Sequence, residues 1–216
     1  YTVLVTNTTN GCQSTALVNV ADAKVIPVVS LSATDNSICD PALTTAVGDN
    51  YNGSVTATVT NQVGALTDYT FAFADGMNAG VQLGTPNHNQ YTQLNGGPTA
   101  YTVIATHTTT GCISGQVSIP VNNVQDLPDL VTASVASTNC APGLEDGQAS
   151  LVTVDGAAPN ATYTYAWTGP LAPAFPVTNG TNNANTSTLI KVQGGAGYDY
   201  TVLVTNTTNG CQSTAL

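Results

Sequence analysis

The chain has 216 residues, of which 42% are hydrophobic and only 6% are charged. It carries 2 Lys+Arg against 12 Asp+Glu, so its formal net charge is −10. Nucleic acids are therefore excluded as partners, and anionic membrane surfaces are disfavoured, because both require clustered cations. We find no signal peptide and no apolar run near the roughly twenty residues of a membrane span, so any targeting signal is expected outside this stretch.

One seventeen-residue stretch occurs twice. YTVLVTNTTNGCQSTAL runs from Tyr1 to Leu17 and again from Tyr200 to Leu216, so the sequence repeats with a period of 199 residues. A looser copy, from Tyr101 to Gln116, divides this period into two related units. Self-similarity at a fixed period is typical of tandem arrays. We interpret the chain as a segment of a longer repetitive fibre.

The first copy reads as a β-hairpin. Apolar residues alternate from Tyr1 to Val5, which is the period of a half-buried strand. Asn10-Gly11 readily takes positive φ and predicts a turn into a second strand, Ser14 to Val20. We therefore assign residues 1–24 to the last strands of a preceding domain.

Two complete units follow, over residues 25–125 and 126–216. The stretch from Pro27 to Cys39 aligns without a gap with the stretch from Pro128 to Cys140. Each unit next has a turn and a strand, then an aromatic strand, YTFAF from Tyr69 and YTYAW from Tyr163. Short strands without any helical period predict an all-β fold of tandem β-sandwich domains.

Polar stretches rich in glycine and proline interrupt both units. They run from Asp75 to Asn89 and from Gly169 to Asn185. We predict loops there, with at most short edge strands.

The five cysteines follow the same repeat. Cys39 and Cys112 are 73 residues apart, and Cys140 and Cys211 are 71 apart. The simple assignment is two equivalent disulfides within the units, Cys39–Cys112 and Cys140–Cys211, with Cys12 pairing to a preceding repeat. Free buried thiols are the alternative, whereas zinc is disfavoured because there is no CxxC pair or histidine cluster. Disulfides indicate an oxidising compartment, hence an extracellular protein.

The stretch from Gly197 to Cys211, preceded by a strand opening with Asp146-Gly and by the aromatic strand, resembles a known family. It is similar to the immunoglobulin-like repeats of giant bacterial surface adhesins, most of all SprB-type repeats exported by the type IX system. The resemblance covers both units and implies a cell-anchored extracellular array of sandwich domains. The antibody cysteine pattern does not carry over, since the first cysteine here precedes the second strand and only one unit has a Trp.

We predict no enzyme and no cofactor. Only His88 and His107 could act as imidazole bases, and His107 takes the repeat position of Asn7 and Asn206, on an expected surface strand. Glu145 has no acidic neighbour beyond Asp146. Lys191 is the one candidate for an isopeptide crosslink, although a side chain reaching to water fits it better.

No metal is assigned, and calcium at the domain junctions is the nearest alternative. The candidate oxygen ligands match no EF-hand spacing, and short acidic loops are usually solvated; they are Asp22, Asp49, Asp126 and Asp129. Glycosylation triplets are equally weak candidates, because a chain rich in Asn and Thr produces them by chance. They begin at Asn7, Asn52, Asn160, Asn179, Asn185 and Asn206.

The first functional hypothesis is a structural repeat of an extracellular, cell-surface fibre or adhesin stalk, stabilised by disulfides. Its partners would be neighbouring repeats of the same chain, or identical subunits that lend a strand to each other. The alternative is an adhesive module whose variable loops recognise cell-surface glycans or another cell. Identical sequences at both ends favour one continuous chain.

Overall fold

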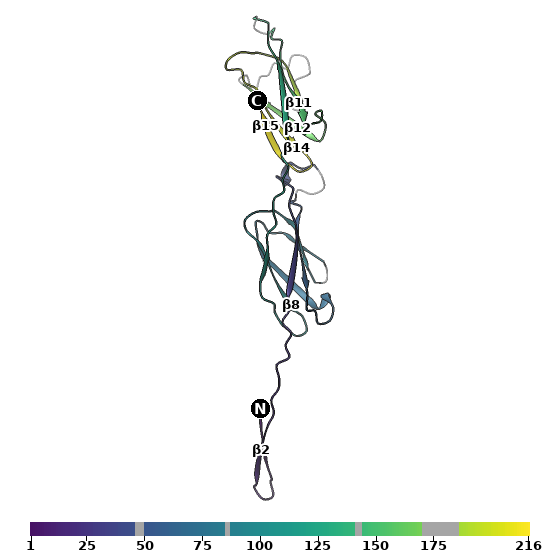
Figure 1. Ribbon diagram of the computed structural model, residues 1–216, viewed down its shortest axis with the longest axis vertical. Coiled ribbons are helices and arrows are strands. Elements are labelled where there is room, and N and C mark those ends of the chain that lie inside the picture. Colours follow the sequence, from purple (N-terminus) through teal and green to yellow (C-terminus); the bar gives the residue numbers. More distant parts are fainter. Residues whose placement is uncertain (46–49, 85–86, 141–143, 170–185) are drawn as a thin grey trace.

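The structure is a computed structural model of the chain and describes all residues except 46–49, 85–86, 141–143 and 170–185. In this described part the fold is all-β, with antiparallel sheets and two short 3₁₀ turns, η1 (Pro41–Leu43) and η2 (Leu66–Asp68). Figure 1 shows a hairpin at one end and two groups of strands stacked above it along the long axis. Over the same residues, no helix is long and apolar enough to cross a membrane.

The N-terminal end is an antiparallel hairpin of β1 (Thr2–Thr6) and β2 (Gln13–Leu17). The predicted hairpin is confirmed, although its second strand ends at Leu17, before the predicted Val20. Gly11 in the turn has a φ of 74°, which glycine adopts without strain. Both faces of the hairpin are exposed, so the apolar alternation of Val3 and Val5 has no second sheet packed on it here.

The first unit has two sheets. One has the strand order β3-β4-β7-β6 and the other β5-β8-β9. The strands of the first sheet are β3 (Val29–Thr34), β4 (Gly53–Val59), β7 (Gln90–Leu94) and β6 (Val81–Leu83). Those of the second are β5 (Tyr69–Asp75), β8 (Tyr101–His107) and β9 (Val117–Ile119). The short strand β6 confirms the edge strand allowed for in the polar stretch after Asp75.

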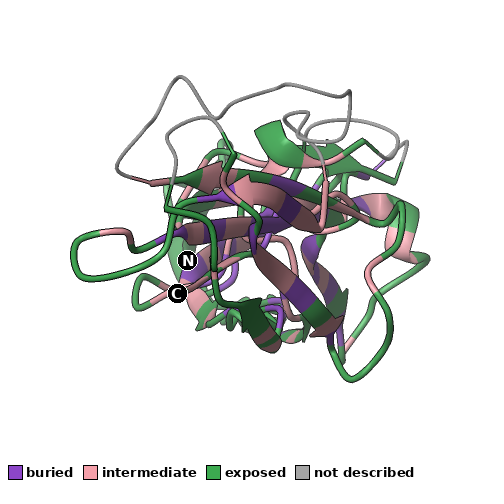
Figure 2. Cartoon of the chain, turned by 90° about the horizontal axis from the view of Figure 1, so that it is seen from above, coloured by how far each residue is buried: buried purple, intermediate pink, exposed green. Residues whose placement is uncertain are grey.

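The core of the first unit lies between its two sheets. Val29, Ala57 and Val59 of one sheet pack with Tyr69, Phe71, Val103 and Ala105 of the other. A second cluster contains Val55, Tyr91, Leu94, Tyr101 and Val121. The aromatic strand thus turns its rings inward as predicted, and each buried ring stabilises the fold by roughly 2 kcal/mol. Figure 2 shows buried and exposed residues alternating along the strands. This arrangement is that of a β-sandwich.

The second unit repeats this plan. Its sheets have the orders β10-β11-β13 and β12-β14-β15. The first contains β10 (Leu130–Val135), β11 (Gly147–Val154) and β13 (Thr188–Val192). The second contains β12 (Tyr163–Thr168), β14 (Thr201–Asn206) and β15 (Gln212–Ala215). Its two core clusters centre on Tyr165 and Tyr200, and Trp167 packs against both. Most of the second predicted loop, residues 170–185, lies outside the described residues.

Strand direction decides which end of a unit each loop occupies. Successive strands reverse, so the loop after β3 and the segment after β9 lie at one end of the first unit, where Asn36 and Asn123 form a bridge. The turn between β8 and β9 lies at the opposite end, where Thr108 N donates to Asp68 O at the start of β5. We call the end with the Asn36–Asn123 bridge the upper end of the unit and the opposite end its lower end. The lower end of the second unit meets the upper end of the first.

Candidate functional site

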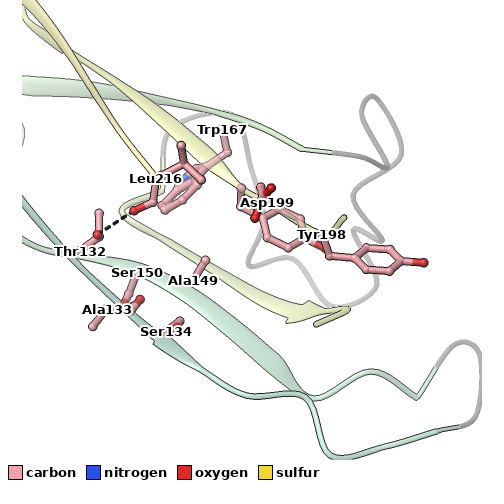
Figure 3. A pocket seen from close by; sticks show the side chains of 10 residues that line it. Thr132, Ala133, Ser134, Ala149, Ser150, Trp167, Tyr198, Asp199 and Leu216 are labelled. Atoms are coloured by element: carbon pink, nitrogen blue, oxygen red, sulfur yellow. Dashed lines mark hydrogen bonds between the residues drawn. The ribbon is translucent and has the colours of Figure 1, made fainter. Parts of the chain in front are cut away.

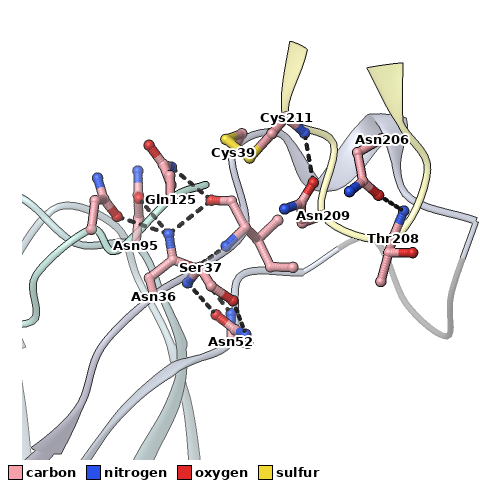
Figure 4. Close-up of a disulfide and its surroundings, with 12 residues drawn as sticks. Asn36, Ser37, Cys39, Asn52, Asn95, Gln125, Asn206, Thr208, Asn209 and Cys211 are labelled. Atoms are coloured by element: carbon pink, nitrogen blue, oxygen red, sulfur yellow. Dashed lines mark hydrogen bonds between the residues drawn. A yellow bond between two sulfur atoms is a disulfide. The ribbon is translucent and has the colours of Figure 1, made fainter. Parts of the chain in front are cut away.

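The most distinctive site is a disulfide between the two units, Cys39–Cys211, with Cα atoms 4.9 Å apart and a sequence separation of 172. Cys39 follows β3 at the upper end of the first unit, and Cys211 precedes β15 at the lower end of the second (Figure 4). Cys12, Cys112 and Cys140 are free thiols in this structure. The pairs predicted within the units, Cys39–Cys112 and Cys140–Cys211, are therefore wrong.

The physical reason is the length of a strand. Cys39 and Cys112 lie at opposite ends of the first sandwich, separated by the seven residues of β8, which rise about 3.3 Å each and so span roughly 20 Å. A disulfide requires Cα atoms within about 7 Å of each other. The same separation holds for Cys140 and Cys211, so a bridge inside either unit is geometrically excluded.

Backbone hydrogen bonds support the disulfide on both sides. Cys39 N donates to Asn209 O at 2.8 Å, and Thr45 N donates to Thr207 O at 2.8 Å. Gly210 sits against the first unit so closely that a Cβ there would lie 2.0 Å from Asp40 O. The junction is thus a close backbone contact between a turn of the second unit and a loop of the first.

The turn of the second unit is shaped by its own sequence, NTTNGC from Asn206 to Cys211. Asn206 Oδ1 accepts from Thr208 N at 2.9 Å, and Asn209 Oδ1 accepts from Cys211 N at 3.0 Å. Gly210 has a φ of 68° and donates its N–H to Asn206 O at 2.8 Å. Asparagine and glycine are the residues that favour such a turn, and together they present Cys211 to the neighbouring unit.

Asn36 fixes the loop that carries Cys39. Its side chain is fully buried, and its Nδ2 lies within hydrogen-bond distance of Ile38 O at 2.8 Å and Asn123 Oδ1 at 2.8 Å. Its Oδ1 accepts from Ile38 N and Asn52 N at 3.2 and 3.3 Å. One buried amide therefore links the loop after β3 to the start of β4 and to the segment that leaves β9.

That leaving segment is the connection to the second unit, and it is tied to the same loop. Gln125 Nε2 donates to Ile38 O at 2.8 Å. Asn122 donates both its backbone N and its Nδ2 to Asp35 Oδ1, at 2.9 and 3.0 Å. The connecting chain and the disulfide loop are thus held together, which limits bending at the junction.

The second unit has a matching loop at its upper end, before Cys140. Asp146 takes the place of Asn52, and its carboxylate accepts from Thr138 N and Thr138 Oγ1 at 2.6 Å each, from Ser137 Oγ at 3.1 Å and from Asn139 N at 3.2 Å. These hydrogen bonds, first of all the one from the Thr138 hydroxyl, lower the pKa of Asp146 to about 2. The carboxylate is therefore ionised at neutral pH and organises the loop.

A groove lies beside β10 and β11 in the second unit. Figure 3 shows it between β10 and β11 on one side and Trp167, Tyr198 and Leu216 on the other, where Thr132 Oγ1 donates to Leu216 O at 2.9 Å. An adjoining cavity of about 410 Å³ continues along Ser137, Gly147 and Val192. In the first unit the equivalent space is filled by the segment after β9, whose Val121 is fully buried.

His107 corrects another expectation, because it lies inside the first unit and not on a surface strand. The residue is 8% exposed, and its ring meets the Tyr69 ring edge-on with the centroids 4.8 Å apart. Nδ1 accepts from Thr110 N at 3.2 Å, and Nε2 lies 3.3 Å from Val63 O. These contacts make His107 a packing residue. His88 is exposed, with a φ of 52°, and the Lys191 side chain is half-buried on β13.

The calcium candidates are not brought together. Asp22 forms an exposed ion pair with Lys24 at 3.1 Å, Asp129 N donates to Asp155 Oδ1 at 2.7 Å, and Asp126 is exposed. Asp49 lies outside the described residues. Within the described ranges, no group of three or more His, Cys, Asp or Glu side chains is placed to hold a metal ion.

The glycosylation triplets remain untested predictions. Asn7 and Asn160 are exposed, Asn206 is half-buried in the junction turn, and Asn52 bonds Ser37 through both side-chain atoms. Asn179 and Asn185 lie outside the described residues. Sequence reasoning missed Asn36, Asn123 and Gln125, whose signal is an amide-rich cluster at strand ends.

Comparison with known proteins adds no assignment: no family model matches the chain, and no curated protein matches it.

Proposed function

We propose that the chain is a structural segment of an extracellular, cell-surface fibre or adhesin stalk, built from tandem immunoglobulin-like domains. The strand orders of the first unit support this domain type. Taking β3 to β9 as strands A to G, its sheets read A-B-E-D and C-F-G, which is the order of constant-type immunoglobulin domains. The described strands of the second unit read A-B-E and C-F-G.

The observation that carries the proposal is the head-to-tail junction. A disulfide, two backbone hydrogen bonds and the close approach of Gly210 join the lower end of one sandwich to the upper end of the next. Such a contact uses different surfaces on its two sides, so it can be repeated without closing on itself. Combined with the 199-residue sequence repeat, it favours an extended array.

The Cys39–Cys211 disulfide supports an extracellular location, because disulfides persist in oxidising compartments. The surface relies on Thr, Asn and Ser, since only 6% of the residues are charged.

The test is the mass of the native protein under denaturing conditions, with and without reductant. We expect a species many times larger than 21.9 kDa that persists after reduction, because the repeats would be joined by peptide bonds. Collapse on reduction to about the mass of one such segment would overturn the single-chain fibre and favour separate subunits joined by disulfides.

A further inference from the structure

We propose that Cys112 and Cys140 form a second disulfide of the same kind, between Cys140 of one copy of the 199-residue repeat and Cys112 of the next copy. This proposal builds on the tandem array proposed above. It assigns both free thiols to a junction that is equivalent to the one joined by Cys39–Cys211.

The turn around Cys112 has the geometry of the turn that carries Cys211. His107 N donates to Cys112 O at 2.9 Å, and Gly111 N donates to His107 O at 2.9 Å. Gly111 has the same φ as Gly210, 68°. A Cβ at Gly111 would meet nothing within 4 Å, whereas at Gly210 the same position is filled by the neighbouring unit. The lower end of the first unit therefore has a turn with the same backbone shape as the turn from Asn206 to Cys211, and no neighbouring unit contacts it at Gly111.

A cavity of about 400 Å³ lies beside this turn, lined by Cys112, Thr110, His107 and Val63, and by the chain at Lys24 and Val25. At the observed junction, Asp40 of the Cys39 loop lies against Gly210, next to the bonded Cys211. The cavity is mainly apolar, which fits the uncharged side chains from Thr138 to Cys140. It provides the space that an incoming Cys140 loop requires.

The Cys140 loop matches the Cys39 loop in sequence and in its supporting bonds. Both contain Cys-x-Pro. Thr138 N donates to Asp146 Oδ1 at 2.6 Å, as Ser37 N donates to Asn52 Oδ1 at 2.8 Å. Cys140 is exposed at the upper end of the second unit. It is thus positioned like Cys39, with no partner among the described residues.

The chain between the units also matches. Counting back from the aligned Pro27 and Pro128, Val20 takes the place of Val121 and Lys24 takes that of Gln125. Val121 is buried in the first unit, whereas Val20 is 69% exposed. The groove beside β10 in the second unit is the space that a Val20 segment from the next copy would fill. Lys24 could then donate to the Cys140 loop, as Gln125 donates to Ile38.

The bond forms by oxidation of two thiols. The Sγ–H groups of Cys112 and Cys140 lose two protons and two electrons, and one S–S bond forms. A disulfide-bearing oxidant, such as a thiol–disulfide oxidoreductase, accepts them and becomes a dithiol. Every junction of the array would then carry one disulfide, and no cysteine of the repeat would remain free.

The test is disulfide mapping of the native, unreduced protein after blocking free thiols with an alkylating reagent. The chain has only 2 Lys+Arg, so an Asp-directed protease is used, which separates all five cysteines. We expect one linked peptide containing Cys112 and Cys140, and one containing Cys39 with the Gly-Cys-Gln-Ser sequence shared by Cys12 and Cys211. Alkylated Cys112 or Cys140, or a Cys39–Cys112 link, would overturn the proposal.

Variants of the full-length protein provide a second test. Cys112→Ser is expected to release one alkylatable thiol per repeat, at Cys140, and Cys140→Ser one at Cys112. Release at Cys39 from Cys112→Ser would contradict the pairing. The mass measurement separates this proposal from the array itself. A large reduced mass with free Cys112 refutes only the disulfide, and a linked pair in a protein that collapses on reduction refutes only the single chain.

Discussion

Replacing Cys211 by serine should destabilise the second unit, whereas the same change at Cys12 should not. The two cysteines lie in identical seventeen-residue sequences, but only Cys211 is buried and bonded to the other unit. The two bonded cysteines have a sequence separation of 172, and closing a loop of that length restricts the unfolded chain by about 5 kcal/mol in the chain-entropy treatment. Native disulfides usually contribute about 2–5 kcal/mol, which is the expected loss for Cys211→Ser.

Urea unfolding of the oxidised 216-residue chain measures this loss. The single tryptophan, Trp167, lies on β12 and reports the second unit by its fluorescence. Cys12→Ser serves as the matched control, with an expected change within about 0.5 kcal/mol. Our reasoning would be refuted if Cys112→Ser lowered the stability as much as Cys211→Ser, or if Cys211→Ser behaved like the control.

Three further changes probe the same junction. Gly210→Ala should weaken the contact between the units and slow disulfide formation, measured by thiol release, more than Gly11→Ala does, because both have positive φ but only Gly210 touches a neighbour. Asn36→Ala should lower the free energy of unfolding of the first unit by about 2–3 kcal/mol in thermal or urea unfolding, since it leaves buried partners unpaired; equal stability would contradict its role. The lowered pKa of Asp146, about 2, means that its contribution to stability is complete above its unfolded pKa near 4 and is lost as the pH falls through 2. Exchange of the Thr138 and Asn139 amides, which donate to this carboxylate, should therefore accelerate in that range. The matched Ser37 amide donates to the side-chain amide of Asn52, which has no carboxyl group to protonate, and should accelerate less.

Much of the fold could be predicted because apolar and polar residues alternate along the strands, and this alternation is visible in the sequence. Tyr101, Val103 and Ala105 alternate with threonine and isoleucine, and all three are buried in β8. Asn10-Gly11 placed the hairpin turn correctly. These features depend on neighbouring residues only, which a single sequence contains.

The disulfide partner could not be read from spacing, because the cysteines recur with nearly equal separations within a unit and in neighbouring units. The number of strands between two cysteines shows whether they lie at the same end of a sandwich. Cys39 follows the first strand and Cys112 follows the sixth, so an odd number of reversals places them at opposite ends of the sandwich. Counting the changes of strand direction excludes a disulfide within one unit. It does not reveal which end of one unit contacts which end of its neighbour.

His107 shows a different limit. Its repeat position is occupied by asparagine in the other copies, which suggested an exposed site. In the first unit, the Tyr69 ring and the Val63 carbonyl cover the imidazole. These two residues lie on either side of η2, and a polar residue in an aligned position does not reveal that they cover it.

The bridge between Cys39 and Cys211 also changes how the chain would respond to tension applied at its two ends. The force would pass from the N-terminus to Cys39, across the sulfur–sulfur bond to Cys211, and on to the C-terminus. The residues between the two cysteines would carry none of it. The bridge bypasses the 171 residues between the two cysteines, which leaves 45 of the 216 residues to lengthen. At about 3.4 Å per extended residue, the oxidised chain reaches about 150 Å and the reduced chain about 730 Å. Oxidation would thus convert a chain that can lengthen severalfold into a nearly inextensible tether, even after both sandwiches have unfolded.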